Sequence, residues 1–353
     1  MQSVERVKRA IGLKSIDDLP VSFELAGETD LKEFYVGAPA SWKPRDYRPY
    51  VFDVEDYVEE KNTRREDEWG IVWGFGETLS AGGIPVRFPL RSIVDIKGYQ
   101  LPEPRGPGRF DRILSAIGEY GGKYCYVTWI GLLFERLHFL LGFEETLVEL
   151  ATNTKVVENA LDRIVEFDLA LVDGLAEAAD GKVHAFASTD DWGGQKNLFI
   201  EPALWRKVFK PRYARIAEQV HRRGLDFWLH SDGKIEEIIP DLIEIGVDVF
   251  NLNTSRLLGI SEFGRRFAGR SCFCTYIDPQ DTAIYGSRND IVQDARGLVK
   301  YWSNDLGSGI LAMDYRGNEI YQGVYSQEEI LERKKTALRA FKEAFREKTG
   351  GRL

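Results

Sequence analysis

Hydrophobic and polar residues alternate along the chain in blocks that predict strands and helices in turn. Between short apolar runs lie longer stretches in which apolar residues recur every three or four positions, the spacing of an amphipathic helix. The clearest helical stretch, residues 155–179, places Val157, Leu161, Ile164 and Val165 on one face. The runs that predict strands are 19–25, 124–130, 184–193, 225–233, 247–253, 271–278 and 309–315.

Short apolar strands separated by helices are typical of parallel strands that helices cover. We therefore predict an α/β fold, a single (β/α)8 barrel of the TIM type that spans residues 1–353, with its eighth strand after Asp278. A doubly wound sheet is the alternative, but no glycine-rich turn follows the first strand. Residues 28–109 are rich in Trp, Tyr, Pro and Gly. We expect loops there, with a hairpin as the alternative, in an irregular, insertion-like N-terminal extension that covers the barrel mouth.

Prolines and one capping pattern mark expected helix ends. Pro211 predicts a kink, and Pro240 predicts a break in the helical stretch around it. Ser326, followed by Glu329 three residues later, predicts a capping box at the start of the last helix.

Composition and charge narrow the class of protein. Hydrophobic residues make up 43% and charged residues 29% of the 353 positions, an ordinary globular balance. The formal net charge of −9 argues against a general nucleic-acid binder. Three cysteines are too few for a disulfide framework. With no signal-peptide pattern at the N-terminus and no apolar run of about 18 residues, we expect a cytoplasmic protein with no membrane partner.

The predicted strand ends carry most of the polar residues, and active sites of such barrels lie at the C-terminal strand ends. A buried polar group is costly unless it is solvated, paired or bound to a ligand. The candidates, in chain order, are Thr128, Trp129, Asp190, Asp191, His230, Asp232, Asn251, Asn253, Asp278, Asp314 and Tyr315.

His230 and Asp232 form the most specific pattern. Residues i and i+2 of an extended chain point to the same side, so both side chains can reach one metal ion or one substrate. The alternative is that Asp232 caps a helix that begins near Lys234. Asp190 and Asp191 precede a Trp-Gly-Gly turn, so turn chemistry competes there with a catalytic role.

Two further groups offer weaker signals. Cys272 and Cys274 lie in an apolar strand and are better explained as core residues than as metal ligands. Trp69 and Trp73, each beside a glycine, are candidates for the wall of a pocket.

Several stretches, in order along nearly the whole chain, carry a family resemblance. They include "RVKRAIGLKSIDDLPV", "EDEWGIVW", "GLLFERLHFLLGFEETLVEL", "DDWGGQKNLFIEPALWRKVFKPRY", "HSDGKIEEIIPDLIEIGVDVFNLN" and "YIDPQ". Together they resemble the uroporphyrinogen decarboxylase superfamily, which includes zinc- and corrinoid-linked methyltransferases. The resemblance implies a (β/α)8 barrel.

The sequence departs from both branches of that family. Uroporphyrinogen decarboxylases carry an arginine-rich segment that binds substrate carboxylates, where this chain has the acidic "VSFELAGETD". An acidic entrance would repel a polycarboxylate. The methyltransferases have His-x-Cys-Gly where this chain has His230-Ser231-Asp232-Gly233, and a second cysteine near the last strand, where Asp314 and Tyr315 stand. A His and carboxylate set is harder and weaker for zinc than a thiolate set.

The resemblance therefore implies an O-demethylase type of methyltransferase, which moves a methyl group from a methoxylated small molecule to a corrinoid carried on a partner protein. It implies a zinc ion held by His230 and Asp232 with Glu135 or Asp314. The expected catalytic residues are Asp190, Asp191 and His230. The expected substrate-binding residues are Trp69, Trp73, Trp129, Asn253, Asp278 and Tyr315. A metal-free decarboxylase of a uroporphyrinogen-like or smaller carboxylic acid and a non-catalytic ligand-binding barrel are the alternatives.

Overall fold

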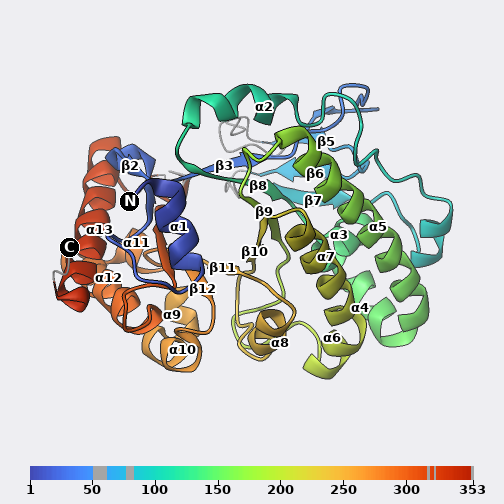
Figure 1. Ribbon diagram of the computed structural model, residues 1–353. Helices are drawn as coiled ribbons and strands as arrows, with labels where there is room; N and C mark the ends of the chain where they lie inside the picture. The colour runs from blue at the N-terminus through green and yellow to red at the C-terminus, as the bar shows by residue number, and fades with distance from the viewer. Residues whose placement is uncertain (51–61, 77–82, 316–318, 322, 351–353) are drawn as a thin grey trace.

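A nearly closed barrel of parallel strands forms the centre of the molecule (Figure 1). The computed structural model describes residues 1–50, 62–76, 83–315, 319–321 and 323–350. The main sheet runs in the order β2-β1-β13-β12-β11-β10-β9-β8-β3, and every neighbouring pair except β2 with β1 is parallel. The strands are β1 (Val21–Phe23), β2 (Glu28–Thr29), β3 (Leu31–Tyr35), β8 (Tyr124–Trp129), β9 (Ala185–Thr189), β10 (Asp226–His230), β11 (Val249–Leu252), β12 (Cys272–Thr275) and β13 (Ile310–Met313). The predicted fold class is confirmed.

The eighth parallel strand lies elsewhere than the sequence predicted. It is β3, inside the segment that we expected to be irregular, whereas the residues after Asp278 form the short helix α11 (Thr282–Tyr285). The charged residues of β3 disguise it. Lys32 is nonetheless buried and pairs with Glu24 at 3.3 Å, and Glu33 accepts a hydrogen bond from Thr128 Oγ1 at 2.6 Å. Both charged residues of β3 are paired in the folded protein. A search for runs of apolar residues therefore does not detect this strand.

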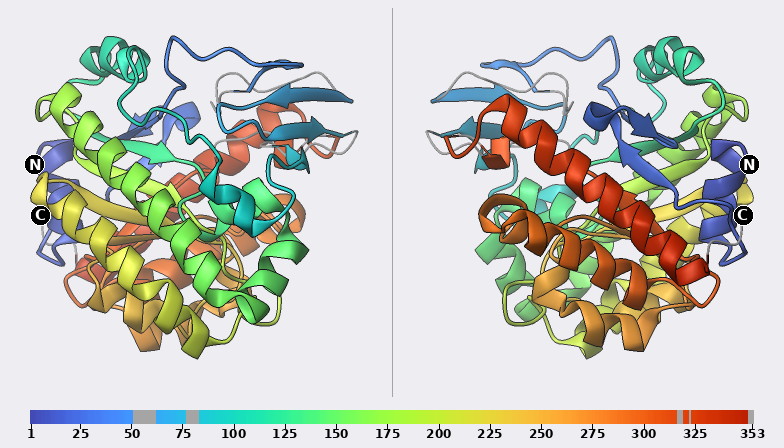
Figure 2. Two further views of the ribbon diagram at one scale, coloured as in Figure 1. Left: turned by 90° about the vertical axis from the view of Figure 1, so that its right-hand side faces the viewer. Right: turned by 90° about the vertical axis from the view of Figure 1, so that its left-hand side faces the viewer.

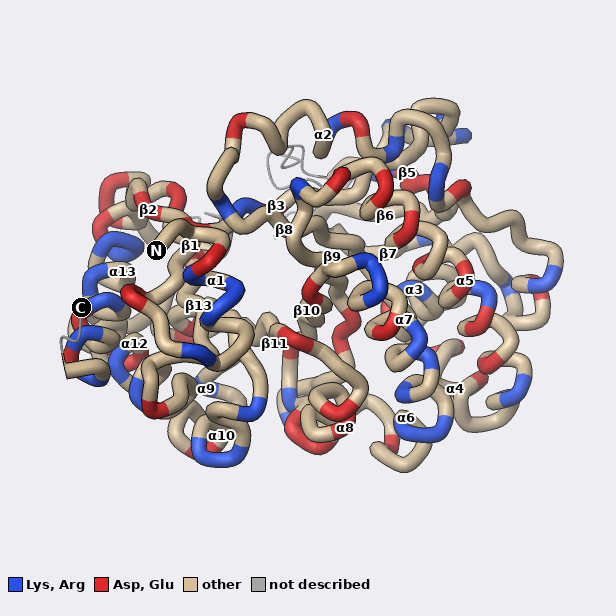
Figure 3. Tube along the Cα trace, in the orientation of Figure 1, with Lys and Arg blue, Asp and Glu red and all other residues tan. Residues whose placement is uncertain are grey.

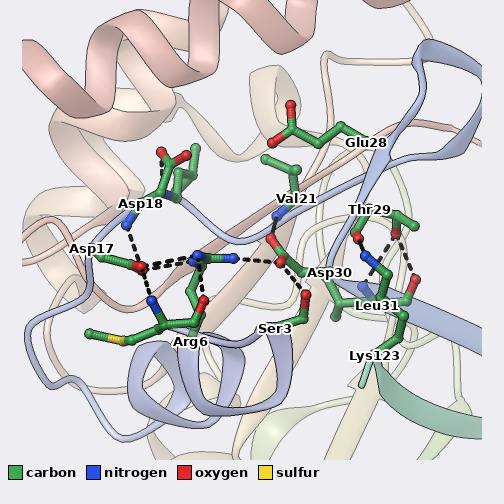
Figure 4. Close-up of polar contacts among 12 residues, drawn as sticks. Ser3, Arg6, Asp17, Asp18, Val21, Glu28, Thr29, Asp30, Leu31 and Lys123 are labelled. Carbon is green, nitrogen blue, oxygen red and sulfur yellow. Dashed lines mark hydrogen bonds and ion pairs between the residues drawn. The ribbon is translucent and has the colours of Figure 1, made fainter. Parts of the chain in front are cut away.

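Asp30, the residue before β3, joins β1 to the opposite end of the barrel sheet (Figure 4). Its backbone N–H donates to the Val21 carbonyl at 2.7 Å, and its carbonyl accepts from the Tyr124 N–H at 2.9 Å. Its carboxylate accepts from the Val21 N–H and from Ser3 and Arg6 of helix α1 (Ser3–Ile11). The N-terminal helix is thereby fixed beside the seam of the barrel.

Helices cover the outside of the barrel, and the long ones α5, α7, α12 and α13 pack along it (Figure 2). The helices are α2 (Asp111–Ile117), α3 (Phe134–Leu141), α4 (Phe143–Thr152), α5 (Thr154–Ala179), α6 (Pro202–Val208), α7 (Lys210–Arg222), α8 (Ile239–Glu244), α9 (Ser255–Leu258), α10 (Ile260–Phe267), α12 (Arg288–Trp302) and α13 (Gln327–Thr349), besides α1 and α11. Basic and acidic residues are interspersed over these outer elements (Figure 3). In the described part of the chain, no helix is long and apolar enough to cross a membrane.

The predicted helix signals can be compared with the helix bounds. The capping box of Ser326 and Glu329 is present at the start of α13. Pro211 lies in the first turn of α7, next to the junction with α6, where we predicted a kink. Pro240 does not break a helix, because α8 begins only at Ile239 and takes this proline into its first turn. The missing proline N–H costs nothing at that position.

A second, four-stranded sheet occupies part of the extension for which we expected loops or a hairpin, so the order there is more extensive than a single hairpin. Its strands are β4 (Arg48–Pro49), β5 (Thr63–Glu66), β6 (Val72–Phe75) and β7 (Ile84–Arg87), in chain order. Trp69 and Trp73 are buried, and Glu68 forms an ion pair with the buried Arg109. Trp69 packs against Trp129 at the end of β8, with ring centroids 6.4 Å apart, and so joins the extension to the barrel.

Candidate active site

Three side chains converge at the C-terminal ends of β9 and β10. Asp191 follows β9, His230 ends β10, and Asp232 lies two residues further on. Each offers one ligand atom, and these atoms all lie within 4.8 Å of one another. His230 Nε2 is 3.7 Å from Asp191 Oδ1 and 4.0 Å from Asp232 Oδ2. We call Asp191, His230 and Asp232 the acid–histidine triad.

A close backbone contact between two loops brings the triad together. A Cβ atom on Gly193 would lie 2.4 Å from Lys234 N and 2.6 Å from the carbonyl carbon of Gly233. Gly233 has a φ of +79°, and a Cβ there would lie 2.0 Å from Gly193 O. The contact also lets the Asp232 N–H donate to Asp191 Oδ1 at 2.7 Å. Two glycines therefore place the acids from separate loops side by side.

The electrostatics of the triad favour a bound cation. Burial by itself lowers the pKa of His230, but Asp232 and Asp191 outweigh it and raise this pKa overall. Burial raises the pKa of Asp232 to about 6, against the opposing effect of His230. Among the residues that the structure describes, neither acid pairs with a lysine or arginine. Two acids that share one histidine and pair with no lysine or arginine repel each other, and a divalent ion would remove that repulsion.

The geometry of the triad fits a metal ion. Ligands about 2.1 Å from a tetrahedral zinc lie about 3.4 Å apart, slightly closer than the triad atoms are. Asp232 Oδ1 is buried and has no hydrogen-bond partner within the described residues. Three protein ligands that leave one coordination position open are typical of catalytic zinc. One imidazole and two carboxylates could equally hold other divalent transition metals.

The structure alters the ligand set that the resemblance implied. His230 and Asp232 lie together, but the third member is Asp191. Asp314 forms an ion pair with the buried Lys334 at 2.8 Å and is outside the triad. Glu135 also stands outside it, although it is a close electrostatic neighbour. Burial, together with Asp191 and Asp190, raises the pKa of Glu135 well above its usual range, and its carboxylate accepts from Thr189 Oγ1 at 2.6 Å.

Asp190, the neighbour of Asp191, is fully buried and holds other parts of the fold in place. Its carboxylate accepts the backbone N–H groups of Leu133, Phe134 and Glu135 at the start of α3, and also the Tyr213 hydroxyl. Burial raises the pKa of Asp190 to about 6 in spite of these donors. A carboxylate enclosed in this way caps a helix, so the predicted catalytic role does not fit its position.

The alternative role for Asp232, as the cap of a helix that begins near Lys234, is wrong. No helix begins near Lys234 for it to cap, since α8 begins at Ile239 and no side chain caps it. Cys272 and Cys274 are fully buried in β12, in keeping with the core interpretation.

The three predicted tryptophans line one cavity. This cavity, about 60 Å³ in volume, lies at the C-terminal ends of β3 and β8 beneath the extension. Trp69, Trp73 and Trp129 all face it, together with Arg136 and Asp67. Burial raises the pKa of Asp67 to about 6, and its carboxylate accepts from the Trp69 and Ile71 N–H groups and from Trp73 Nε1.

The other predicted substrate-binding residues lie away from this cavity. Asn253 follows β11 and is half-buried. Asp278 accepts the backbone N–H groups of Arg256 and Gln280, both at 2.9 Å, and is buried. Tyr315 lines a smaller cavity of about 20 Å³ with Asp314. Substrate contact by any of the six residues stays a prediction.

Sequence reasoning missed three features of the mouth. It placed Asp191 among the catalytic residues but outside the ligand set. It overlooked Glu33, whose charge contributes to the raised pKa of His230, because β3 was taken for a loop. It overlooked Arg136, the arginine of the quoted "FERLHF" stretch, for which an arginine in an otherwise apolar helical turn was the available signal.

Comparison with known proteins identifies the family. The model of the uroporphyrinogen decarboxylase family (URO-D) matches residues 76–312, well over half of the chain. The chain therefore belongs to the uroporphyrinogen decarboxylase family, and this membership indicates an enzyme. No curated protein matches the chain.

Solved structures with a similar fold are distant in sequence. An L-ribulose 3-epimerase is 14% identical, with 70% of this chain and 85% of the other covered and a TM-score of 0.47. A D-psicose 3-epimerase from Clostridium cellulolyticum H10 is 12% identical, with 72% and 87% covered and a TM-score of 0.44. A glycoside hydrolase family 5 enzyme from Prevotella bryantii B14 is 12% identical, with 69% and 78% covered and a TM-score of 0.40. At these values the matches say nothing about chemistry.

Proposed function

We propose that this member of the family is a metal-assisted methyltransferase of the O-demethylase type. It takes a methyl group from a methoxylated small molecule and delivers it to the reduced corrinoid of a partner protein. The observation that supports this proposal is the acid–histidine triad, a three-ligand set without a basic partner among the described residues, at the mouth of a barrel of this family.

In this proposal Asp191, His230 and Asp232 hold a zinc ion. When bound, the ion acts as a Lewis acid toward the ether oxygen. The bond between the methyl carbon and that oxygen breaks, and the methyl group goes to the cobalt(I) of the corrinoid, which is the electron-pair donor. The oxygen leaves with the bonding electrons and takes up one proton.

We assign the delivery of that proton to Glu135. Its carboxylate accepts from Thr189 Oγ1 at 2.6 Å, at the end of β9 and two residues before Asp191, and burial together with Asp191 and Asp190 raises its pKa well above the usual range. A buried carboxyl group with a raised pKa is suited to act as a general acid. Asp190, by contrast, has its carboxylate enclosed by donors and takes no part in the reaction.

The direct test is methyl transfer to free cob(I)alamin from a panel of methoxylated compounds, followed by the absorbance of methylcobalamin. Elemental analysis of the purified protein comes first. We expect about one zinc ion per chain, and methyl transfer that a chelator abolishes and added zinc restores. A protein that holds no metal and transfers no methyl group from any donor would rule out the proposal. Release of carbon dioxide from a carboxylic acid, undiminished by chelator, would establish the decarboxylase alternative in its place.

A further inference from the structure

Arg136 is a buried arginine in the first turn of α3 with its guanidinium group between two tryptophans. The residue is only 4% exposed. Its guanidinium carbon lies 4.3 Å from the ring centroid of Trp69 and 5.1 Å from that of Trp129. Stacking on indole faces holds the plane of the group in a fixed orientation beside the cavity.

The hydrogen-bonding capacity of Arg136 is largely unused. Within the described part of the chain, its one hydrogen bond runs from Nη2 to the Ile130 carbonyl, and Nε is buried without a partner. Nη1 likewise has no hydrogen-bond partner among these residues, and the residue lines the cavity. A guanidinium has five N–H donors, so most of those of Arg136 are free to bind an acceptor from a ligand. Buried charges in proteins are otherwise paired and hydrogen-bonded.

The nearby acids do not fill this role. Asp67 already accepts three hydrogen bonds from its own turn, and Glu68 is paired with Arg109. Asp168 is fully buried, and neither of its carboxylate oxygens has a hydrogen-bond partner among the described residues, so Arg136 does not donate to it. None of the three forms an ion pair with Arg136 among the described residues.

Arg109, the partner of the cavity-lining Glu68, is by comparison a purely structural arginine. Its Nε and Nη2 donate to the Glu103 carbonyl, Nη1 donates to the Gly37 carbonyl, and both terminal nitrogens pair with Glu68. All three of its nitrogens are therefore engaged within the protein. Arg136 differs from it in that its donors face a cavity.

We propose that this cavity binds the carboxylate of a small molecule, which pairs with Arg136 while its apolar or aromatic body lies against Trp69, Trp73 and Trp129. A planar guanidinium and a carboxylate form two parallel hydrogen bonds, which gives the contact both strength and direction. The tryptophan walls suit a flat apolar body. The cavity opens at the ends of β3 and β8, and the triad lies at the ends of the next strands, β9 and β10.

The position of the cavity beside the triad indicates the class of methyl donor. The identification of the bound acid as the methyl donor rests on the proposed function, whereas the binding of a carboxylate does not. The donor would then be a methoxylated carboxylic acid with its acid group anchored by Arg136.

Calorimetric titration with benzoate and benzamide tests the binding site without any activity. The two probes share size and ring but differ in charge, so the difference in affinity measures anion recognition. We expect wild-type protein to bind benzoate at least about tenfold more tightly than benzamide, as a charged hydrogen-bonded pair provides. Arg136→Gln should abolish this difference, and Arg136→Lys should retain part of it, since lysine keeps the charge without the planar donors. Arg206→Gln, an exposed control on α6, should leave both affinities unchanged.

Equal binding of the two probes, binding of neither, or benzoate binding that survives Arg136→Gln would overturn the inference. The wild-type comparison alone decides the matter if the Arg136 variants do not fold. Methyl transfer from 4-methoxybenzoate and from 4-methoxybenzamide then separates the two proposals. If benzoate binds through Arg136 but no donor is demethylated, the carboxylate site stands and the proposed function falls.

Discussion

Acidic residues end strands on both sides of the barrel mouth, and the structure uses them in opposite ways. At the ends of β12 and β13, Asp278 accepts two backbone N–H groups and Asp314 is paired with the buried Lys334. At the ends of β9 and β10, Asp191 and Asp232 have only His230 as a charged partner in the part of the chain that is described. We call these the paired side and the open side.

The contrast teaches which polar strand ends belong to the fold and which belong to a ligand. A buried acid with a lysine or amide partner is a completed structural contact, and removing the partner leaves an uncompensated charge. Two acids that face each other and a histidine oppose folding by their mutual repulsion. We therefore infer that Asp191 and Asp232 serve to bind a ligand at the barrel mouth rather than to stabilise the fold.

The largest expected effect is on the free energy of unfolding. A substitution on the paired side should lower it, and a substitution on the open side should raise it slightly. Lys334→Met removes the partner of Asp314 and a donor to the Tyr315 carbonyl, and should lower the free energy of unfolding by about 3–5 kcal/mol. Asp191→Asn in metal-free protein relieves repulsion and should change that free energy by less than about 1 kcal/mol, in the stabilising direction. Urea unfolding of both variants measures this. Equal destabilisation by the two substitutions would contradict the distinction between the sides.

The next effect concerns metal affinity. His230→Ala removes one of three ligands from the triad, and the dissociation constant for zinc should rise by more than about a hundredfold. Loss of a residue that only hydrogen-bonds to a metal ligand already lowers metal affinity by about 10–100-fold. Competition with a chromophoric chelator measures it. Asp314→Asn is the control from the paired side, and its zinc affinity should equal that of the wild type. Loss of zinc in Asp314→Asn would return this residue to the ligand set that the sequence implied.

Much of the fold was predictable because most barrel strands are apolar and short. The exceptions are instructive: β3 reads as a loop because Lys32 and Glu33 carry charges whose partners, Glu24 and Thr128, are visible only in three dimensions. The sequence indicated at most a hairpin where the small sheet lies, for a related reason. Its strands contain prolines and charged residues and lack an alternating hydrophobic pattern of their own. We attribute their regular structure to packing over the barrel.

The candidate site was half predictable. The pairing of His230 with Asp232 follows from the spacing of an extended chain. The division between Asp190 and Asp191 does not, because successive residues of a strand point to opposite sides and the sequence does not tell which side faces α3. The entry of Asp191 into the triad depends on a contact between two loops that are far apart in the chain. Arg136 was overlooked because its tryptophan neighbours come from two other segments.

That loop contact gives the smallest and most specific effect. Gly193→Ala would place a methyl group against the backbone of Gly233 and Lys234, so the loops must separate and Asp191 must move relative to Asp232. We expect zinc affinity to fall by about tenfold, less than the loss of a ligand, since all three ligands remain. Gly194→Ala is a matched control, because its new Cβ would meet only Phe199 at 3.4 Å and Asn197 at 3.6 Å, and its zinc affinity should not change. If the two alanine variants bind zinc alike, the glycine contact does not set the geometry of the open side. The acids would then have to be held in place by the rest of their loops.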